Sequence, residues 1–350
     1  MRHALALASR ALGRVAPNPA VGCVIVSKDG HIVGRGWTQP GGRPHAETVA
    51  LAAAGALAKG TTAYVTLEPC SHHGETRSCA DALITAGIAR VVAAVTDPDP
   101  RVSGGGFAKL TAAGIAVRQD VLKAEATFLN EGFFKRISAG RPMVALKSAE
   151  SADGFVAKAG AKHRITGERA RNHGHLLRAQ YDAIVCGIGT AIADDPLLTC
   201  RLPGMEDRSP IRIVLDTHLR LSPDSQLAKT ACAHPVVVFT AAKDGDVLMG
   251  KDVEIARVPA GANGHVDLRA VLAELAKRGL TRALVEGGPT IEGAFLDAGL
   301  ADRVYVYRAP ARLGGGIRGI GSRISADARF HSFARTELGP DVLESYALKG

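Results

Sequence analysis

Three residues that commonly bind transition metals are spaced along the first part of the chain: His45, Cys70 and Cys79. Imidazole and thiolate groups are ligands that Zn²⁺ prefers, and three protein ligands leave a fourth position open for water, as in catalytic zinc sites. A structural zinc site takes four protein ligands. Because the three residues are far apart in the sequence, a fold that uses them together must bring separate segments to one point. This requirement constrains the first part of the chain more than any other feature.

Glu47 lies two residues after His45 and is not needed as a ligand. Its carboxylate is therefore free to take a proton from a water molecule and pass it to a leaving group. The spacing H-x-E, followed by P-C and a second Cys, is typical of zinc-dependent nucleobase deaminases. The alternative is a structural or absent metal, with each cysteine a small buried hydrophobe and the histidine a hydrogen-bonded residue. We favour the catalytic zinc because these residues occur together.

Local sequence supports the convergence of these ligands. Pro44 suits the first position of a helix, and the Ala/Leu-rich run at residues 47–57 continues it, so we expect His45 and Glu47 in the first helical turn. Cys79 begins a second predicted helix, where the helix N-terminus and the metal both favour the thiolate.

Two further features near the cysteines leave alternatives open. His72 and His73 could each replace a cysteine as ligand, but we expect them beside the metal or in contact with a substrate. The sequence Asp97-Pro98-Asp99-Pro100, followed by a Gly-rich segment at residues 103–106, is either a plain turn or a loop that offers N–H groups to a ribose or phosphate.

The length and composition indicate an ordinary globular protein of two domains, with 350 residues, 46% hydrophobic and 22% charged. No stretch resembles a transmembrane span or a secretion signal, and six cysteines do not form a dense disulfide pattern, so we expect a cytoplasmic protein. The net charge is +9, but the basic residues are scattered and aromatic residues make up only 4%. We therefore expect an anionic small-molecule substrate, no nucleic acid and no membrane.

Strands and helices alternate in both predicted domains. In the first we expect strands at residues 21–26, 31–37, 62–67 and 90–95, helices at 1–12, 47–57 and 80–86, and a helix-strand-helix segment from 107 to 137. This order predicts a three-layer α/β domain with its chemistry at the carboxyl end of strand 62–67.

The small residues at 138–142 form the expected linker. Beyond it we expect strands at 143–149, 182–187, 211–215, 235–239, 282–285 and 303–307, helices at 167–179, 266–277 and 290–298, and a polar loop at 190–201. The segment Glu286-Gly287-Gly288-Pro289-Thr290 joins a strand to a helix, where a glycine backbone can approach phosphate. No G-x-G-x-x-G motif opens a βαβ unit, which argues against a Rossmann domain.

The first domain resembles the deaminase half of the bifunctional riboflavin-biosynthesis deaminase/reductase family. The resemblance rests on the segments at residues 17–26, 45–47, 66–74 and 97–100, which read PNPAVGCVIV, HAE, TLEPCSHHG and DPDP. This family separates its two cysteines by eight residues, as this chain does, whereas tRNA-adenosine and cytidine deaminases keep C-x-x-C. The resemblance implies that Asn18 contacts the substrate and that Glu47 is catalytic.

The second domain resembles the reductase half of the same family, which is related to dihydrofolate reductase. The matching motifs include residues 165–167 (ITG), 187–190 (GIGT), 193–199 (ADDPLLT), 286–290 (EGGPT) and 313–315 (LGG). The resemblance implies NADPH binding by Thr190, Asp194, Gly288, Pro289, Thr290, Ile291, Glu292, Gly293 and Ala294. It also implies substrate binding by Arg178, Leu198, Arg201 and Glu286, with the arginines on the phosphate.

Lys147 is expected to polarise or protonate the reacting end of the sugar, although a surface lysine is the alternative. Where the family commonly has Ser-Leu-Asp-Gly and a Trp before Ile-Thr, this chain has residues 151–154 (SADG) and Arg164. Arg164 could bind cofactor phosphates in place of an aromatic wall.

Together these features predict an α/β protein, with a cytidine-deaminase-like α/β/α domain at residues 1–138 and a dihydrofolate-reductase-like domain at 143–350. The resemblance implies zinc-dependent deamination of 2,5-diamino-6-(5-phosphoribosylamino)pyrimidin-4-one, then NADPH-dependent reduction of the ribosyl chain. We also expect a homo-oligomer. One alternative is a tRNA or nucleoside deaminase with an unrelated or inactive second domain. Another is a zinc-stabilised nucleotide sensor whose reductase half has decayed.

Overall fold

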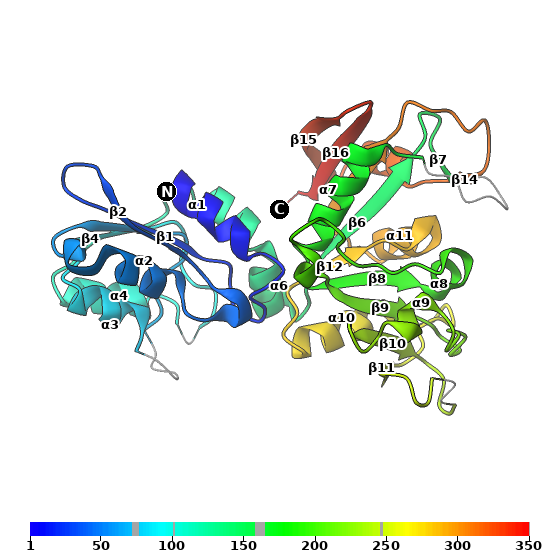
Figure 1. Cartoon of the computed structure of the whole chain (residues 1–350), viewed down its shortest axis with the longest axis horizontal. Coiled ribbons are helices and arrows are strands. Elements are labelled where there is room, and N and C mark those ends of the chain that lie inside the picture. The colour runs from blue at the N-terminus through cyan, green and yellow to red at the C-terminus, as the bar shows by residue number, and fades with distance from the viewer. Residues whose placement is uncertain (72–76, 101, 158–164, 246–247, 350) are drawn as a thin grey trace. The chain divides into compact units, whose positions relative to one another are not determined.

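The computed structural model describes residues 1–71, 77–100, 102–157, 165–245 and 248–349. The chain divides into two compact units, Met1–Gly140 and Arg141–Gly350, and both are coloured by residue number in Figure 1. The expectations for His72, His73 and Arg164 concern residues outside the described ranges.

The first unit is built on one five-stranded sheet with the strand order β2-β1-β3-β4-β5. Strand β1 is antiparallel to β2 and β3, whereas β3, β4 and β5 run parallel. The strands are β1 (Gly22–Val26), β2 (Ile32–Trp37), β3 (Thr62–Val65), β4 (Arg90–Ala93) and β5 (Ala116–Arg118). The α-helices are α1 (Arg2–Ala8), α2 (Ala46–Ala54), α3 (Cys79–Thr85), α4 (Gly105–Ala112), α5 (Lys123–Leu129) and α6 (Glu131–Ala139), and 3₁₀ turns occupy Ser9–Ala11, Pro40–Gly42 and Gly55–Ala58.

Helices cover both faces of this sheet, which confirms the predicted α/β/α arrangement. Along β1 successive side chains point to opposite faces, as the pleat of a strand requires. Val24 packs with Ala4 of α1, whereas the preceding residue, Cys23, packs with Ala46 and Ala50 of α2. The sheet is thus the middle of three layers.

Glycines on β2 let helix α2 lie close to the sheet. A Cβ atom at Gly36 would lie 2.2 Å from the carbonyl oxygen of Ala46, and one at Gly34 would lie 2.2 Å from that of Ala50. Any larger residue would therefore displace the helix from the strand. This close approach sets the position of the helix end that carries His45.

The start of α2 differs from the prediction. Pro44 is not the first helical residue, because the helix begins at Ala46 and His45 is its N-cap with extended backbone. The Pro44 carbonyl accepts a hydrogen bond from the Gln39 N–H at 3.1 Å and so takes no part in the helix. The first helical hydrogen bond is the one that the Val49 N–H donates to the His45 carbonyl, at 3.2 Å. Only Glu47 lies in the first turn, and the helix stops at Ala54 instead of continuing to residue 57.

The second unit is built on a nine-stranded sheet with the order β11-β10-β9-β8-β12-β6-β13-β16-β15, and a separate pair joins β14 and β7. The strands are β6 (Met143–Glu150), β7 (Phe155–Ala157), β8 (Ala183–Gly187), β9 (Ile211–Leu215), β10 (Val236–Thr240), β11 (Val253–Arg257), β12 (Arg282–Val285), β13 (Arg303–Arg308), β14 (Ile317–Arg318), β15 (Phe330–Leu338) and β16 (Asp341–Leu348). The helices are α7 (Glu168–Arg178), α8 (Ile188–Asp194), α9 (Gln226–Lys229), α10 (Leu268–Lys277), α11 (Gly288–Asp297) and α12 (Gly321–Ala326), with a 3₁₀ turn at Glu206–Arg208.

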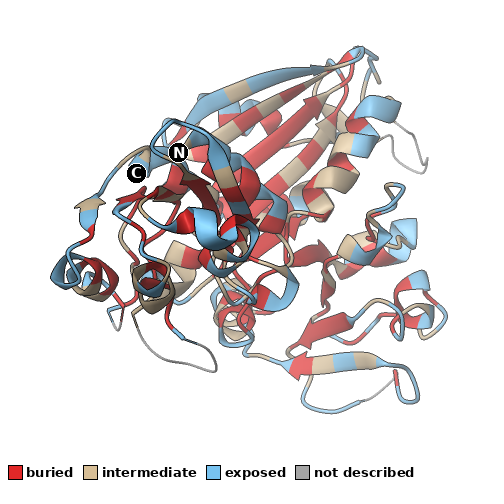
Figure 2. Cartoon of the chain, turned by 60° about the vertical axis from the view of Figure 1, so that its left-hand side comes forward, coloured by how far each residue is buried: buried red, intermediate tan, exposed pale blue. Residues whose placement is uncertain are grey.

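The nine-stranded sheet is also covered on both faces. Val144 of β6 packs with Phe295 of α11, and the next residue, Ala145, packs with Leu177 of α7. The strands from β11 to β13 run parallel, and β16 and β15 add an antiparallel edge. In Figure 2 the central strands are mostly red, the colour of buried residues, and the outer sides of the helices are mostly pale blue, the colour of exposed residues. Parallel strands are expected to be buried in this way.

One expectation for the second unit was wrong, and several strands were missed. The predicted polar loop at 190–201 begins with helix α8, because Ile188 and Ala191 are buried and their packing favours a helix. Strands β7, β11, β14, β15 and β16 were not predicted. Most residues of β15 are exposed, including Arg335 and Glu337, so the strand has no continuous apolar face to signal it.

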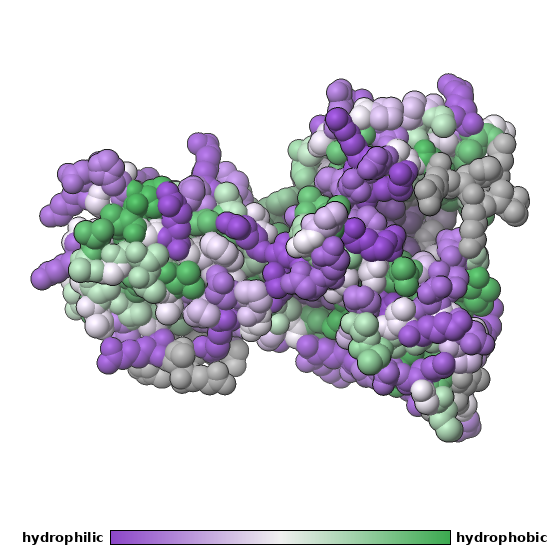
Figure 3. All heavy atoms as spheres, in the orientation of Figure 1, coloured by the Kyte–Doolittle hydropathy of each residue, from purple (hydrophilic) through white to green (hydrophobic). Residues whose placement is uncertain are grey.

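No helix within the described ranges is both long enough and apolar enough to cross a membrane. On the face shown in Figure 3, hydrophilic side chains are interspersed with smaller apolar groups.

Candidate functional site

The three predicted metal ligands meet at one point in the first unit. His45 is the N-cap of α2, Cys79 is the first residue of α3, and Cys70 lies in the loop after β3. The Nδ1 atom of His45 lies 3.3 Å from the Sγ atom of Cys79 and 3.8 Å from that of Cys70. The three ligand atoms all lie within 4.8 Å of one another. Two helix N-termini and the loop after β3 therefore form a single cluster of soft and borderline donors.

The chemistry of this cluster fits zinc. The backbone N–H of Cys79 donates a hydrogen bond to the Sγ atom of Cys70 at 3.2 Å. Hydrogen bonding from Cys79, supported by His45, lowers the pKa of the Cys70 thiol to about 4, so this sulfur is a thiolate at neutral pH. One imidazole and two sulfur donors provide three of the four ligands of a tetrahedral zinc site.

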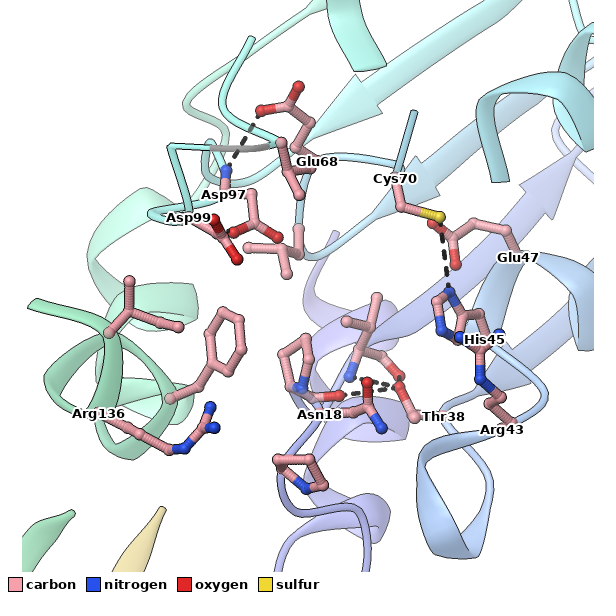
Figure 4. A pocket seen from close by; sticks show the side chains of 17 residues that line it. Asn18, Thr38, Arg43, His45, Glu47, Glu68, Cys70, Asp97, Asp99 and Arg136 are labelled. Carbon is pink, nitrogen blue, oxygen red and sulfur yellow. Dashed lines mark hydrogen bonds between the residues drawn. The ribbon is translucent and has the colours of Figure 1, made fainter. Parts of the chain in front are cut away.

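Glu47 is buried beside the cluster, with 3% of its surface exposed. Figure 4 shows its side chain next to Cys70 and His45 on the same side of the cavity. Burial, together with the negative charge of Cys70, raises the pKa of Glu47 to about 7. A carboxyl group with such a pKa can both accept and release a proton near neutral pH.

A cavity of about 260 Å³ opens next to these residues. Figure 4 shows the side chains that line it, which come from several separate segments. Its polar lining residues beyond the metal cluster are Asn18, Thr38, Arg43, Glu68, Asp97, Asp99 and Arg136. Burial raises the pKa of Asp97 to about 6. The wall therefore combines two arginines with carboxyl and amide groups, which can bind a small molecule that is anionic at one end and rich in polar groups elsewhere.

Glu68 attaches the aspartate loop to this cavity. Its Oε2 atom accepts hydrogen bonds from the backbone N–H groups of Asp97, at 3.2 Å, and Gly104, at 3.0 Å. Its Oε1 atom accepts them from Gly106, at 2.9 Å, and Phe107, at 3.4 Å. One carboxylate thus satisfies four backbone donors from the loop and from the start of α4. The sequence predicted this loop to be either a turn or a ligand contact. Glu68, in the segment after β3, holds it at the cavity.

Asn18 is held at the opposite wall. Gly42 lies against its side chain so closely that a Cβ atom there would lie 1.9 Å from the Asn18 Nδ2 atom. The segment after Asn18 is bound by Asn130, whose Oδ1 accepts from the Ala20 N–H and whose Nδ2 donates to the Ala20 carbonyl, both at 2.9 Å. These contacts fix the segment that presents Asn18 to the cavity.

The second unit contains a larger cavity, of about 770 Å³, at the carboxyl ends of its parallel strands. This volume lies within the range of sites that bind cofactors. Its wall includes these residues that the family resemblance assigned to cofactor, substrate or catalysis: Lys147, Arg178, Thr190, Asp194, Leu198, Glu286, Gly288, Pro289, Thr290, Ile291, Glu292 and Ala294. Arg201 and Gly293 were assigned with them but are not part of the wall.

The fit to a dinucleotide rests on the start of α11. Gly288, with a φ of 75°, is the first residue of this helix, and Thr190 donates a hydrogen bond to the Gly287 carbonyl at 2.7 Å. A Cβ atom at Gly287 would lie 2.1 Å from a side-chain carbon of Ile291, so glycine is required there. The turn leaves helix N–H groups directed at the cavity, where they can bind phosphate.

Charged groups meet at the centre of this cavity. Arg178 donates hydrogen bonds to both oxygens of Glu286, each at 2.9 Å, and Lys147 Nζ lies 3.7 Å from Glu286 Oε2. Burial alone would raise the pKa of Glu286, but the positive charges of Arg178 and Lys147 outweigh it and lower that pKa to about 2. Lys147 also lies over the ring of Tyr307, 5.5 Å from its centroid. It is therefore a paired residue of the cavity wall and not a free surface lysine.

Residues 142–342 match the family described as RibD C-terminal domain, and residues 1–95 match the cytidine and deoxycytidylate deaminase zinc-binding region. The riboflavin biosynthesis protein RibD of Escherichia coli (strain K12) is 44% identical, covering 98% of this chain and 96% of its own length. The chain belongs to the RibD family.

Solved structures of this family have the same fold. Acinetobacter baumannii RibD, form 1, superposes with a TM-score of 0.87 at 36% identity and covers 100% of this chain and 98% of its own. The diaminohydroxyphosphoribosylaminopyrimidine deaminase/5-amino-6-(5-phosphoribosylamino)uracil reductase of Thermotoga maritima has a TM-score of 0.87 at 33% identity, with coverage of 100% and 97%.

Membership of the RibD family confirms the main prediction. The chain is a bifunctional enzyme of riboflavin biosynthesis, a zinc-dependent deaminase and an NADPH-dependent reductase. The alternative of a tRNA or nucleoside deaminase with an unrelated second domain is wrong, because residues 142–342 match the RibD reductase domain. The relatives that match nearly the whole chain are deaminase/reductases, which favours an enzyme over the non-enzymatic nucleotide sensor.

Several polar residues of the two cavities were not singled out from the sequence. In the first cavity these are Thr38, Arg43, Glu68 and Arg136, and in the second they are Thr217, His218, Arg220, Asn263 and His265. A signal existed for Thr217 to Arg220, because they directly follow β9, and ligands bind at the carboxyl ends of parallel strands. No comparable signal marks Asn263 and His265, which lie in a connection before α10.

Proposed function

We propose that residues 1–138 deaminate 2,5-diamino-6-(5-phosphoribosylamino)pyrimidin-4-one, with zinc held by His45, Cys70 and Cys79. The observation that carries this proposal is the meeting of these ligand atoms beside the buried carboxyl of Glu47. Bound zinc lowers the pKa of a water ligand and so supplies a nucleophile at neutral pH. Glu47 takes the proton of the attacking water and returns it to the departing amino group, which leaves as ammonia.

The remaining wall of the first cavity matches the rest of this substrate. Arg43 and Arg136 are cationic and suit its phosphate. Asn18 offers both an amide donor and an acceptor, and Asp97 and Asp99 offer acceptors for ribose hydroxyls or amino groups. We assign Asn18 to substrate binding on this basis.

For residues 143–350 we propose reduction of the deaminated product at its ribosyl chain. NADPH, when bound, supplies the hydride. Its proposed binding residues are Thr190, Asp194, Gly288, Pro289, Thr290, Ile291, Glu292, Gly293 and Ala294, at the N-terminus of α11 and on α8. His218 and Arg220 add positive charge to the same wall, which suits the cofactor's phosphates.

The substrate of this second step would contact Arg178, Leu198, Arg201 and Glu286. Arg178 uses three of its donors on Glu286 and on the Thr199 carbonyl, so its guanidinium is held in place before the substrate arrives. Arg201 lies on the same segment as Leu198, and we propose that both arginines bind the phosphate. Lys147 would polarise or protonate the reacting end of the sugar.

We also propose that the enzyme is a cytoplasmic homo-oligomer that binds no nucleic acid. All six cysteines are free, which suits a reducing compartment. Strand β15 forms the last position in the described order of the large sheet, and such an edge can pair with a second copy. Light scattering after size-exclusion chromatography should give a mass above that of one chain. A salt-sensitive affinity for RNA would contradict the proposal that the enzyme binds no nucleic acid.

The decisive experiment incubates the zinc-loaded protein with the diaminopyrimidine substrate and NADPH, and follows ammonia release and NADPH oxidation together. We expect ammonia first and NADPH consumption after it. Glu47→Gln should abolish ammonia release while the bound zinc, measured by metal analysis, stays equimolar. This variant should still oxidise NADPH when the deaminated intermediate is supplied. Retained deamination by Glu47→Gln would refute the assigned mechanism.

A further inference from the structure

Glu292 is a buried acid in the wall of the larger cavity. It lies on α11 with 2% of its surface exposed, and its Oε2 atom has no hydrogen-bond partner within the described ranges. The hydroxyl of Ser148 on β6, which also lines the cavity and is 2% exposed, likewise lacks one there. Buried polar atoms are nearly always paired, so two such atoms on one cavity wall indicate a function that awaits a ligand.

Two carboxyl groups of this cavity have opposite protonation states. Glu286 is ionised, because Arg178 and Lys147 lower its pKa to about 2. Burial raises the pKa of Glu292 to about 8, although the charge of Lys147 and the hydroxyl of Ser148 act against the rise. Pairs of titratable groups whose environments separate their pKa values in this way commonly divide acid and base roles between them.

The other charges around Glu292 are already paired. Glu150 on β6 is bound to Arg308, at 3.2 Å, and Lys147 lies beside Glu286. On the neighbouring α12, Arg323 forms an ion pair with Asp297. No cation among the described residues is therefore paired with the Glu292 carboxyl, and its neutral form is favoured.

The reductase step consumes a proton as well as a hydride. The hydride adds to C1′ of the ribosyl group, the bond between C1′ and the ring oxygen breaks, and that oxygen takes a proton to become a hydroxyl. Lys147 forms an ion pair with Glu286 in the cavity wall, a position suited to polarising the sugar. A neutral carboxyl in the same wall is a better proton source at neutral pH.

We propose that Glu292 is the proton source of the reductase step and that the Ser148 hydroxyl relays its proton to the ring oxygen of the ribosyl group. Ser148 gives its proton to the oxygen as C1′ accepts the hydride, and Glu292 restores it. The resulting carboxylate is protonated again from solvent once the product has left. This inference rests on the proposed function of the second unit.

The test follows NADPH oxidation by the full-length enzyme with the deaminated intermediate, from pH 6 to pH 10. The wild type should lose about tenfold in kcat for each pH unit above about 8. Glu292→Gln, which keeps the shape and hydrogen bonding of the side chain, should lower kcat by about 100-fold and remove this pH dependence. KM for the deaminated intermediate should change less than about threefold, because the proposed role toward this substrate concerns the proton and not binding. Glu292→Asp, which restores an acid, should recover part of the rate.

A second measurement does not depend on activity. Infrared spectroscopy of the ligand-free protein at pH 7 should show a protonated carboxyl band that Glu292→Gln lacks and that Ser148→Ala retains. Ser148→Ala should nevertheless reduce kcat, since it removes the relay. The matched control, Glu274→Gln on α10, should leave both kcat and the band unchanged.

Three outcomes would overturn the proposal. A Glu292→Gln variant with wild-type kcat and pH profile would exclude Glu292 as the proton source. Absence of the band from the wild type would show that Glu292 is ionised. A wild type that never oxidises NADPH would instead refute the proposed reductase function, and this inference would fail with it.

Discussion

Arg178 and Glu286 form a two-pronged ion pair, in which Nε and Nη2 of the arginine each lie 2.9 Å from a different carboxylate oxygen. The arginine comes from the end of α7 and the glutamate from the end of β12, and their side chains are only 15% and 8% exposed. A second cation, Lys147, lies 3.7 Å from Oε2 of the same carboxylate. This pair joins two elements of the second unit at the point where we place the phosphate-bearing substrate.

Glu286→Gln should therefore impair both stability and reduction. The glutamine removes the negative charge from between two cations that are largely removed from solvent, and breaking a buried pair costs about 3 kcal/mol. Hydrogen exchange at the amides of β6 and β12 in the full-length protein measures this loss. The control is Glu254→Gln, which breaks the exposed pair with Arg278 and should cost less than about 1 kcal/mol. Equal costs for the two variants would contradict the interpretation.

Glu68→Gln should raise the KM of the deaminase by about tenfold or more. An amide offers one acceptor oxygen and places an N–H₂ group against backbone N–H donors, so two of the four hydrogen bonds to the aspartate loop are lost. Zinc content should not change. Ammonia release as a function of substrate concentration measures the effect, and Glu125→Gln on the exposed side of α5 is the control. A reduced kcat with unaltered KM would argue against loop positioning.

Removal of zinc should separate the two activities. The proposed ligands all lie in the first unit, so dialysis against a chelator should eliminate ammonia release but leave reduction of the deaminated intermediate within about twofold. Readdition of Zn²⁺ should restore deamination. Loss of NADPH oxidation on chelation would show that the second unit depends on the metal, contrary to this expectation.

The stability of the second unit should fall as the pH rises, because of Glu292. In the unfolded chain this carboxyl ionises near its ordinary pKa of 4.5, whereas in the folded protein it stays protonated until about pH 8. Between these values the folded state binds more protons, so the free energy of unfolding decreases by up to about 1.4 kcal/mol per pH unit. Comparison of wild type and Glu292→Gln in urea from pH 5 to pH 8 tests this. The variant should gain stability relative to the wild type with rising pH, and a constant difference would contradict the prediction.

The sequence alone determined the chemistry of the first site and the class of both units. The identities and spacing of His45, Glu47, Cys70 and Cys79 indicate zinc chemistry. Few residue types bind zinc, and an acid two residues after a histidine ligand is typical of zinc-dependent deaminases. The alternation of apolar strands with helical segments predicted both α/β units. These signals can be read along the chain from residue types and their spacing, without knowing which segments meet in the fold.

Other features were decided only by tertiary structure. The predicted loop at 190–201 begins with helix α8, whose Ile188 and Ala191 pack in a core cluster with residues distant in the sequence, and strand β16 pairs with the distant β13. Glu68 holds a loop about thirty residues further on, and nothing in its own segment predicts that. The pKa of Glu292 is set by burial between α11 and β6, and that of Glu286 by Arg178 and Lys147. Desolvation and charge pairing act through space, and only the fold specifies which groups are neighbours.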